Sequence, residues 1–311
     1  MSLQISLFPL GPPARTGLMA AGRQRLAAAT GRIPPVPLLL LSILSIQFSS
    51  ALATTLFSTL GPAGTTLTST ILAAVVLTIA APPKIDARIR RHALLIGIAG
   101  VIDAIMALPF LMSLQYIPLG LAATIGFLGP LGLAVATSRK PIHFLWIAIA
   151  AIGIALLTPA IGPGLSPLGL GLAGFSALGW AAFVLVTKRI GKVFDGRDGL
   201  TFGIWVSTAL LLPFALAEGS MFRAGPADLL ASLVVALLGA VLPLALEFQA
   251  LQRMTARTYG TLVTLEPAAG ALVGALCLGQ SLGPRVLAAI ACVTIAAMGV
   301  TIFERRDKPD A

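Results

Sequence analysis

The sequence predicts an all-α polytopic membrane protein in which ten transmembrane helices form two inverted five-helix repeats. Of its 311 residues, 57% are hydrophobic and only 10% are charged, and the mean hydropathy is +0.98. A soluble domain carries about 25% charged residues, so these few charges cannot cover a solvated surface. A lipid bilayer must therefore surround most of the chain. The spacing of the apolar segments, the placement of the basic residues and a repeat between the two halves supply the rest of the prediction.

Ten apolar segments are long enough to span a bilayer, which takes about 20 residues of helix. Clusters of charges, prolines and glycines separate them, and the connectors are too short for a soluble domain. A basic tail at 1–34, which we expect to be disordered, precedes a first repeat at 35–160; a second repeat at 167–303 precedes a tail at 304–311. The predicted helices span about 36–57, 64–82, 93–113, 119–137, 143–159, 168–187, 200–217, 228–250, 258–277 and 285–303.

Lysine and arginine lie almost entirely on one side of this arrangement. The two tails and the connectors after the even-numbered helices carry 19 of the 21 basic residues, and only Arg223 and Arg285 fall on the other side. Because basic loops stay in the cytoplasm, this distribution places both termini there. The net charge of +10 is spread over these short connectors, so it indicates membrane loops and no nucleic-acid-binding surface.

The second half of the chain repeats part of the first with an offset of 137 residues. Leu114-Gln115 then aligns with Leu251-Gln252, and Pro130 aligns with Pro267. Since five helices are an odd number, the second copy enters the membrane in the opposite direction. Many secondary transporters are built in this way, with a binding site near the membrane midplane between the halves.

The two aligned prolines interrupt their helices at matched depths. A proline leaves the carbonyl four residues earlier without its partner, here those of Gly126 and Val263. A free carbonyl is costly in lipid, so we expect Pro130 and Pro267 to be hinges that face a common cavity. A kink with no further role is the alternative for either proline taken alone.

Four short motifs carry a family resemblance. They are SIQ at Ser45–Gln47, LGPAG at Leu60–Gly64, GW at Gly179–Trp180 and, most specific, RTYGTLVTLEP at Arg257–Pro267. The chain resembles the EamA-type transporters of the drug/metabolite transporter superfamily from about residue 38 to residue 303, and most of all the threonine/homoserine exporter group. The resemblance implies ten helices in two inverted repeats, a central cavity and proton-linked export from the cytoplasm of a bacterium across its inner membrane.

The chain departs from that group at three charged positions. Group members often carry a lysine, an arginine and a glutamate where this chain has Thr54, Ser69 and Gly126. Because the three charges are absent together, we expect a binding site that differs from that of the group. The sequence therefore does not decide whether threonine or homoserine is the substrate. The second half keeps its charged residues Glu247, Arg257 and Glu266.

Three carboxylates fall inside predicted spans: Asp103, Glu247 and Glu266. An ionisable group at the bilayer centre costs about 2.5–3.5 kcal/mol, so each is a candidate for a proton or substrate pathway. Glu266 adjoins the proline hinge and is the strongest candidate, with a protonated structural hydrogen bond as its alternative. Asp103 could instead join two helices. For Glu247 we favour a structural ion pair with Arg253 or Arg257.

Uncharged side chains complete the predicted pathway. Gln47 and Ser69 lie in the first two helices, which are rich in hydroxyl groups, and Trp180 and Tyr259 are candidate cavity walls. Small hydroxyl side chains also pack helices together, and aromatic side chains can face lipid, so each residue has a structural alternative.

Motifs of other function classes are missing or weak. The sequence has no GxxxxGK[ST] and no HExxH, and its GxGxxG at 169–174 follows no strand. We therefore expect no enzyme activity, no cofactor and no metal. The favoured function is an inner-membrane secondary transporter that exports a small polar metabolite, an amino acid or derivative, in exchange for protons; a homodimer is compatible with it. The alternatives are a superfamily carrier for a nucleotide-sugar, cation or lipid-linked solute, and an intramembrane enzyme or scaffold.

Overall fold

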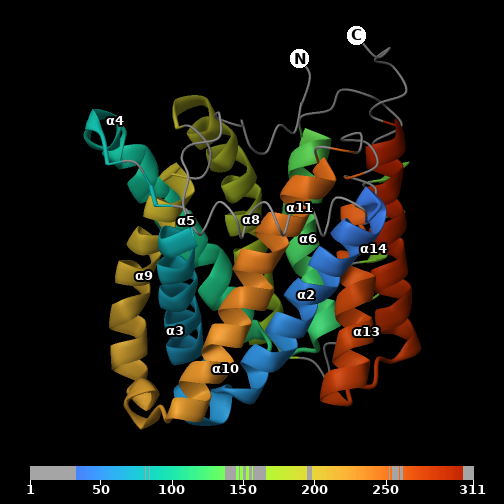
Figure 1. The fold of residues 1–311 in the computed structure, drawn as a ribbon. Helices are drawn as coiled ribbons and strands as arrows, with labels where there is room; N and C mark the ends of the chain where they lie inside the picture. Colours follow the sequence, from blue (N-terminus) through green and yellow to red (C-terminus); the bar gives the residue numbers. More distant parts are fainter. Residues whose placement is uncertain are drawn as a thin grey trace.

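The computed structural model describes residues 33–80, 82–83, 85–136, 145–146, 148–149, 152–153, 156, 166–194, 198–251, 253, 259 and 262–303. Over these residues the chain is a bundle of helices without strands (Figure 1). Six of the described helices are long and apolar enough to cross a membrane, and three shorter apolar helices accompany them. The prediction of an all-α, multi-pass membrane protein is thus confirmed. Most of the predicted helix at 143–159 and nearly all of both tails lie outside the described residues.

The first half follows the predicted helices closely, with two differences. Its helices are α2 (Pro35–Thr55), α3 (Phe57–Ala80), α5 (Ala93–Ser113) and α6 (Leu119–Ala136). The first difference is a short helical segment, Phe57–Leu60, that α3 includes before a sharp non-helical kink at Gly61, whose φ is 64°; the main part of α3 follows this kink, close to the predicted start at residue 64. A short helix that the sequence analysis missed, α4 (Ala87–Arg91), follows Asp86, and the Arg88 hydrogen bond to that carboxylate lowers the pKa of Asp86.

The second half holds α8 (Pro167–Val193), α9 (Asp198–Glu218), the short turn η2 (Ser220–Arg223) and α14 (Pro284–Phe303). The predicted helix at 228–250 consists of α10 (Pro226–Ala236), a π-helical turn η3 (Leu237–Val241) and α11 (Leu242–Leu251). The prediction of one continuous helix at 258–277 was wrong. A turn at residues 264–265 interrupts it, and α13 (Glu266–Leu278) begins at Glu266. Pro267 suits the first turn of a helix because that turn needs no N–H from it.

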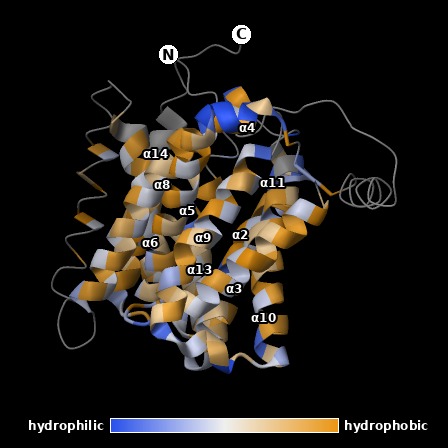
Figure 2. Cartoon of the chain, turned by 90° about the vertical axis from the view of Figure 1, so that its left-hand side faces the viewer, coloured by the Kyte–Doolittle hydropathy of each residue, from blue (hydrophilic) through white to orange (hydrophobic). Residues whose placement is uncertain are grey.

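Basic residues gather at one end of the bundle, which we call the basic end. It carries the starts of α2 and α5 and the ends of α8, α11 and α14, and it is the upper end in Figure 1. Hydrophilic residues collect there around α4, while hydrophobic residues dominate the flanks of the helices (Figure 2). The described basic residues of this end are Arg88, Arg90, Arg91, Lys188, Arg189, Lys192 and Arg253. The opposite end holds Arg223 and Arg285 together with the acids Glu218 and Asp228.

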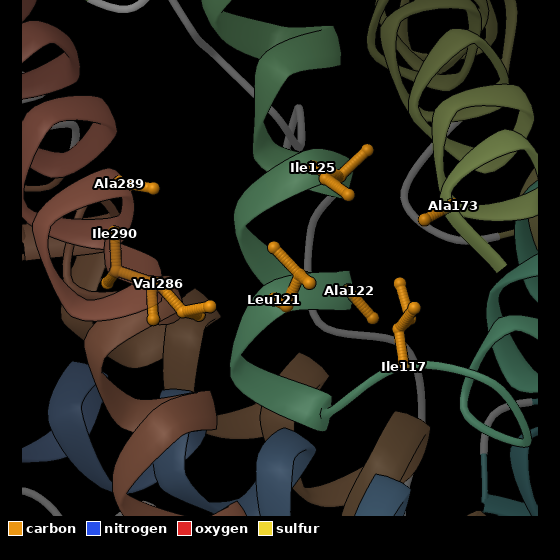
Figure 3. Packing of buried hydrophobic residues seen from close by; sticks show 8 residues of the cluster. All are labelled: Ile117, Leu121, Ala122, Ile125, Ala173, Val286, Ala289 and Ile290. Carbon is orange, nitrogen blue, oxygen red and sulfur yellow. The ribbon is translucent and has the colours of Figure 1, made fainter. Parts of the chain in front are cut away.

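Helices from the two halves pack against one another throughout the bundle. The helix α5 packs on α8 and α9, and α3 packs on α9 and α10. The helix α2 packs along α11 and α13, while α6 contacts α8, α13 and α14. Figure 3 shows one buried apolar cluster of this kind, in which α6 lies between α14 and α8. The two halves therefore share their cores and do not form separate domains.

Candidate functional site

Glu247 on α11 is held by two hydroxyl groups from other segments of the chain. Ser42 on α2 donates a hydrogen bond of 2.8 Å from Oγ to Oε1, and Tyr259 donates one of 3.2 Å from its hydroxyl to Oε2. The expected ion pair with Arg253 is not among the contacts of Glu247; the Arg253 guanidinium instead donates to the carbonyl of Ile33 at 3.3 Å. Arg257 lies outside the described residues. Glu247 is thus tied to neutral partners inside the bundle.

Glu266 stands at the helix break beside this group. It is the first residue of α13, where a negative charge interacts favourably with the helix dipole. Its carboxyl group is within electrostatic range of Glu247 and Tyr259, but in the described part of the chain no hydrogen bond joins it to either of them. The structure therefore brings three predicted site residues together: Glu247, Tyr259 and Glu266. We call these three and Ser42 the carboxylate cluster.

A π-helical turn lies next to the cluster on the α10–α11 side. In η3 the N–H of Leu242 bonds to the carbonyl of Leu237, five residues back, which leaves the carbonyl of Leu238 without its usual helical partner. Ser45 on α2 donates to that carbonyl at 2.7 Å, and Ser49 donates to the carbonyl of Val235 at 2.8 Å. Ser45 and Ser49 therefore link α2 to the helix formed by α10, η3 and α11. Their hydroxyl groups pack two helices together, which is the structural alternative given above for small hydroxyl side chains.

Gln47 on α2 is buried with an unsatisfied oxygen. Its residue surface is 3% exposed, and its Oε1 has no hydrogen-bond partner. The oxygen lies against Gly270 of α13: a Cβ built on that glycine would sit 3.1 Å from it and 3.1 Å from the Cβ of Ala123 on α6. Gly270 follows Glu266 by four residues, so both occupy the same face of α13.

Trp180 on α8 lies beside the proline-containing part of α6. A Cβ on Gly126 would meet the indole ring at 3.8 Å, and Phe127 packs edge-on against that ring with centroids 5.9 Å apart. Pro130 leaves the carbonyl of Gly126 without its helical partner. Val263 packs on the same apolar cluster as Phe127 and Trp180, so the segments that precede the two prolines meet there.

Two predicted residues lie apart from the carboxylate cluster. Asp103 on α5 faces Ser207 on α9, and the buried Ser207 hydroxyl makes no hydrogen bond of good geometry in the described part of the chain. Ser69 on α3 has a buried hydroxyl without a hydrogen-bond partner. Neither residue shares a described contact with Glu247 or Glu266.

Ser42 was missed by the sequence analysis as a partner of the carboxylate. Its signal was the spacing of Ser42, Ser45 and Ser49, which places three hydroxyl groups on one face of a helix. Glu218 was also missed. Its Oε2 accepts the N–H groups of Ala63 and Gly64, at 2.9 and 3.1 Å, and so caps the part of α3 that follows the bend.

Comparisons with known proteins agree with this architecture. Residues 167–302 match the EamA-like transporter family. The threonine/homoserine exporter RhtA of Escherichia coli (strain K12) is 31% identical over 276 residues, which covers 88% of this chain and 93% of the relative. RhtA of Salmonella typhimurium (strain LT2) is 30% identical over 285 residues, covering 90% and 96%. A solved crystal structure superposes on 88% of this chain and 99% of its own with a TM-score of 0.57 and 19% identity, a likeness in fold alone. This chain therefore belongs to the EamA-like transporter family of the drug/metabolite transporter superfamily.

Proposed function

We propose that this transporter exports threonine, homoserine or a closely similar amino acid from the cytoplasm across the bacterial inner membrane, in exchange for protons. Membership of the family makes the protein a transporter and not an enzyme. The relatives at 30–31% identity are named threonine/homoserine exporters, which supports the substrate class. The observation that carries the proposal of proton exchange is the carboxylate cluster at the break before α13.

Two carboxylates that lie close together in a low-dielectric interior repel each other when both are ionised. A proton bound to either glutamate, or an ammonium group between them, relieves this repulsion. Glu247 and Glu266 interact in this way, and the Ser42 and Tyr259 hydroxyls hold Glu247 in position. A proton and the ammonium group of an amino acid would therefore compete for one site, which is the basis of an antiporter.

The helix break gives the cluster a means of moving. A conformational change follows from ligand binding only if the ligand interacts differently with the two states. Glu266 is the first residue of α13, directly after the turn at 264–265, so a change in its charge acts on a segment boundary. We propose Pro130 and Pro267 as the matched hinges of the two halves.

The packing of the helices supports two inverted repeats. The proposed repeat pairs α2 with α8, α3 with α9, α5 with the helix formed by α10, η3 and α11, and α6 with α13. When the two members of every pair are exchanged, the α5–α8 contact becomes the contact of α2 with α10, η3 and α11. The exchange likewise converts α5–α9 into α3–α10 and α6–α8 into α2–α13, while α3–α9 and α6–α13 remain unchanged. Ser176 on α8 also donates to the carbonyl of Met106 on α5 at 2.7 Å, as Ser45 does to Leu238.

Transport in vesicles tests the proposal. Purified protein is placed in liposomes, and uptake of labelled threonine is measured with the interior more acidic than the outside and with both sides at one pH. We expect the gradient to drive accumulation and a proton ionophore to abolish it. If threonine is exchanged at the same rate with and without the pH gradient, the proposal of proton coupling is contradicted. If no amino acid is transported, the proposed substrate class is contradicted.

A further inference from the structure

We propose that the side-chain amide of Gln47 binds the hydroxyl group of the transported amino acid and so selects hydroxylated substrates. This inference rests on the proposed function, because it assigns a part of that substrate to one residue. It goes further in naming the group that distinguishes threonine and homoserine from apolar amino acids of the same size.

The unsatisfied oxygen is the first step. A buried amide carbonyl without a donor is unfavourable, and buried polar groups in folded proteins nearly always have a partner. Gln47 Oε1 is enclosed by α2, α6 and α13 and has none. Nearby on the same helix, Ser45 and Ser49 both have partners, so α2 does satisfy its polar groups where the role is packing. A hydrogen-bond donor on the substrate would satisfy the Oε1 atom of Gln47.

The position relative to Glu266 is the second step. Gly270, which Oε1 contacts, lies one helical turn from Glu266, a rise of about 6 Å along α13. The charged ammonium group pairs best with a carboxylate, which leaves the neutral hydroxyl for the neutral amide. An amino acid between these groups would thus meet Glu266 with its ammonium group and Gln47 with its side chain.

The surrounding residues are the third step. A Cβ on Gly270 would lie 3.1 Å from the amide oxygen, and the Cα of Gly120 on α6 would lie 3.3 Å from that Cβ. These small residues therefore allow α13 and α6 to pack closely beside Gln47. No bulky side chain of theirs fills the space next to the amide, so a substrate would need only the two helices to move apart. In this proposal α13 separates from α6 at the turn of residues 264–265 when the substrate enters.

The test compares threonine with 2-aminobutyrate, which has the same shape except that it lacks the hydroxyl group. In vesicles that contain the parent protein, we expect threonine to compete for transport at least about 10-fold better, because a site built to bind a hydroxyl rejects an analogue without one. Gln47→Met keeps the size of the side chain but removes the acceptor, so the preference should fall to about 1. Gln115→Met is the matched control, since Gln115 is exposed at the opposite end, and it should keep the parent's preference.

Three outcomes would overturn the inference. They are equal competition by the two amino acids in the parent, an unchanged preference in Gln47→Met, and an equal loss in Gln115→Met. If Gln47→Met does not fold, Gly270→Ala replaces it: its Cβ presses on the amide, and the preference for threonine should fall more than total transport does. A parent that moves neither amino acid would defeat the proposed function itself, whereas a parent that moves both equally would defeat only the role of Gln47.

Discussion

Ser42 on α2 donates a 2.8 Å hydrogen bond to Glu247 on α11, across 205 positions of the chain. Tyr259 donates to the other oxygen of the same carboxylate. The two hydroxyls therefore fix Glu247 from two separate segments, and they leave its charge uncompensated by any described cation. A carboxylate held in this way is positioned without being neutralised, which keeps it available to a proton or a substrate.

Replacing Ser42 by alanine should loosen this arrangement. The variant loses one hydrogen bond to a buried carboxylate, and we expect the free energy of unfolding in detergent to fall by about 1 kcal/mol. Transport should slow because Glu247 is no longer fixed. Thr55→Ala is the control: its exposed hydroxyl donates only to Leu52 of its own helix at 2.7 Å, so it should change neither quantity. Equal effects of the two substitutions would contradict a positioning role for Ser42.

Glu266→Gln should separate proton coupling from substrate movement. Glutamine keeps the size and hydrogen-bonding capacity of a protonated glutamate but cannot ionise. We expect the variant to fold, to exchange labelled threonine across vesicle membranes and to lose accumulation driven by a pH gradient. Asp103→Asn, whose carboxylate faces Ser207 on α9 and not the cluster, should retain accumulation. If Glu266→Gln accumulates threonine against its gradient as well as the parent does, proton coupling does not depend on Glu266. Asp103 would then be the next candidate.

Most of the helix pattern could be predicted because apolar length and basic connectors are read directly from composition along the chain. The starts of α5 and α6 agree with the prediction to the residue, at Ala93 and Leu119. The break before Glu266 was placed wrongly, because a proline in an apolar run was taken as a mid-helix kink. Its sequence also fits a helix that begins there, and only packing with other segments decides between the two.

The site could be predicted in residue types but not in contacts. Glu247 and Glu266 were singled out because charged groups in spans are costly, and Tyr259 was singled out as a candidate cavity wall. Ser42 as the partner of Glu247 could not be found, because nothing local in the sequence shows which helices α2 will face. The separation of Asp103 from the cluster has the same cause. Residues that share depth in the membrane need not share an interface.

Gly61 should not tolerate a side chain. Its φ of 64° is in the left-handed region, and a Cβ there would run into the carboxyl group of Glu218. Because that carboxylate caps the N–H groups of Ala63 and Gly64, we expect Gly61→Ala to destabilise the fold by about 1–3 kcal/mol, measured as detergent unfolding. Gly97→Ala is the control, since a Cβ there meets nothing within 4 Å. If both variants unfold alike, Glu218 does not hold this end together.

Reporter fusions should place the two ends of the bundle on opposite sides of the membrane. The ends of α8 and α9 lie at opposite ends of the bundle in Figure 1, and the basic end carries seven of the nine described basic residues on the helices and turns named above. A reporter that is active only in the cytoplasm should therefore work when fused after Lys192 and fail when fused after Gly219. The reverse result would invert the proposed direction of export.

The last prediction concerns why only one half carries the hinge acid. With the offset of 137 residues, Gly129 on α6 corresponds to Glu266. A Cβ on Gly129 would collide with the backbone carbonyl oxygen of Ala177 on α8, so α6 and α8 approach too closely there for any side chain. Gly132, three residues later on the same helix, is exposed, and a Cβ there would meet nothing within 4 Å.

The two glycines therefore form a matched pair for substitution by alanine. Gly129→Ala should lower the free energy of unfolding by about 1–3 kcal/mol, because the helices must separate to admit the methyl group. Gly132→Ala should leave it unchanged or raise it by up to about 1 kcal/mol, because alanine favours a helix over glycine. Thermal unfolding of both variants in detergent measures the difference. A Gly129→Ala protein at least as stable as Gly132→Ala would mean that α6 and α8 have room for a side chain. The close contact of these helices would then no longer explain why the acid occurs in the second half alone.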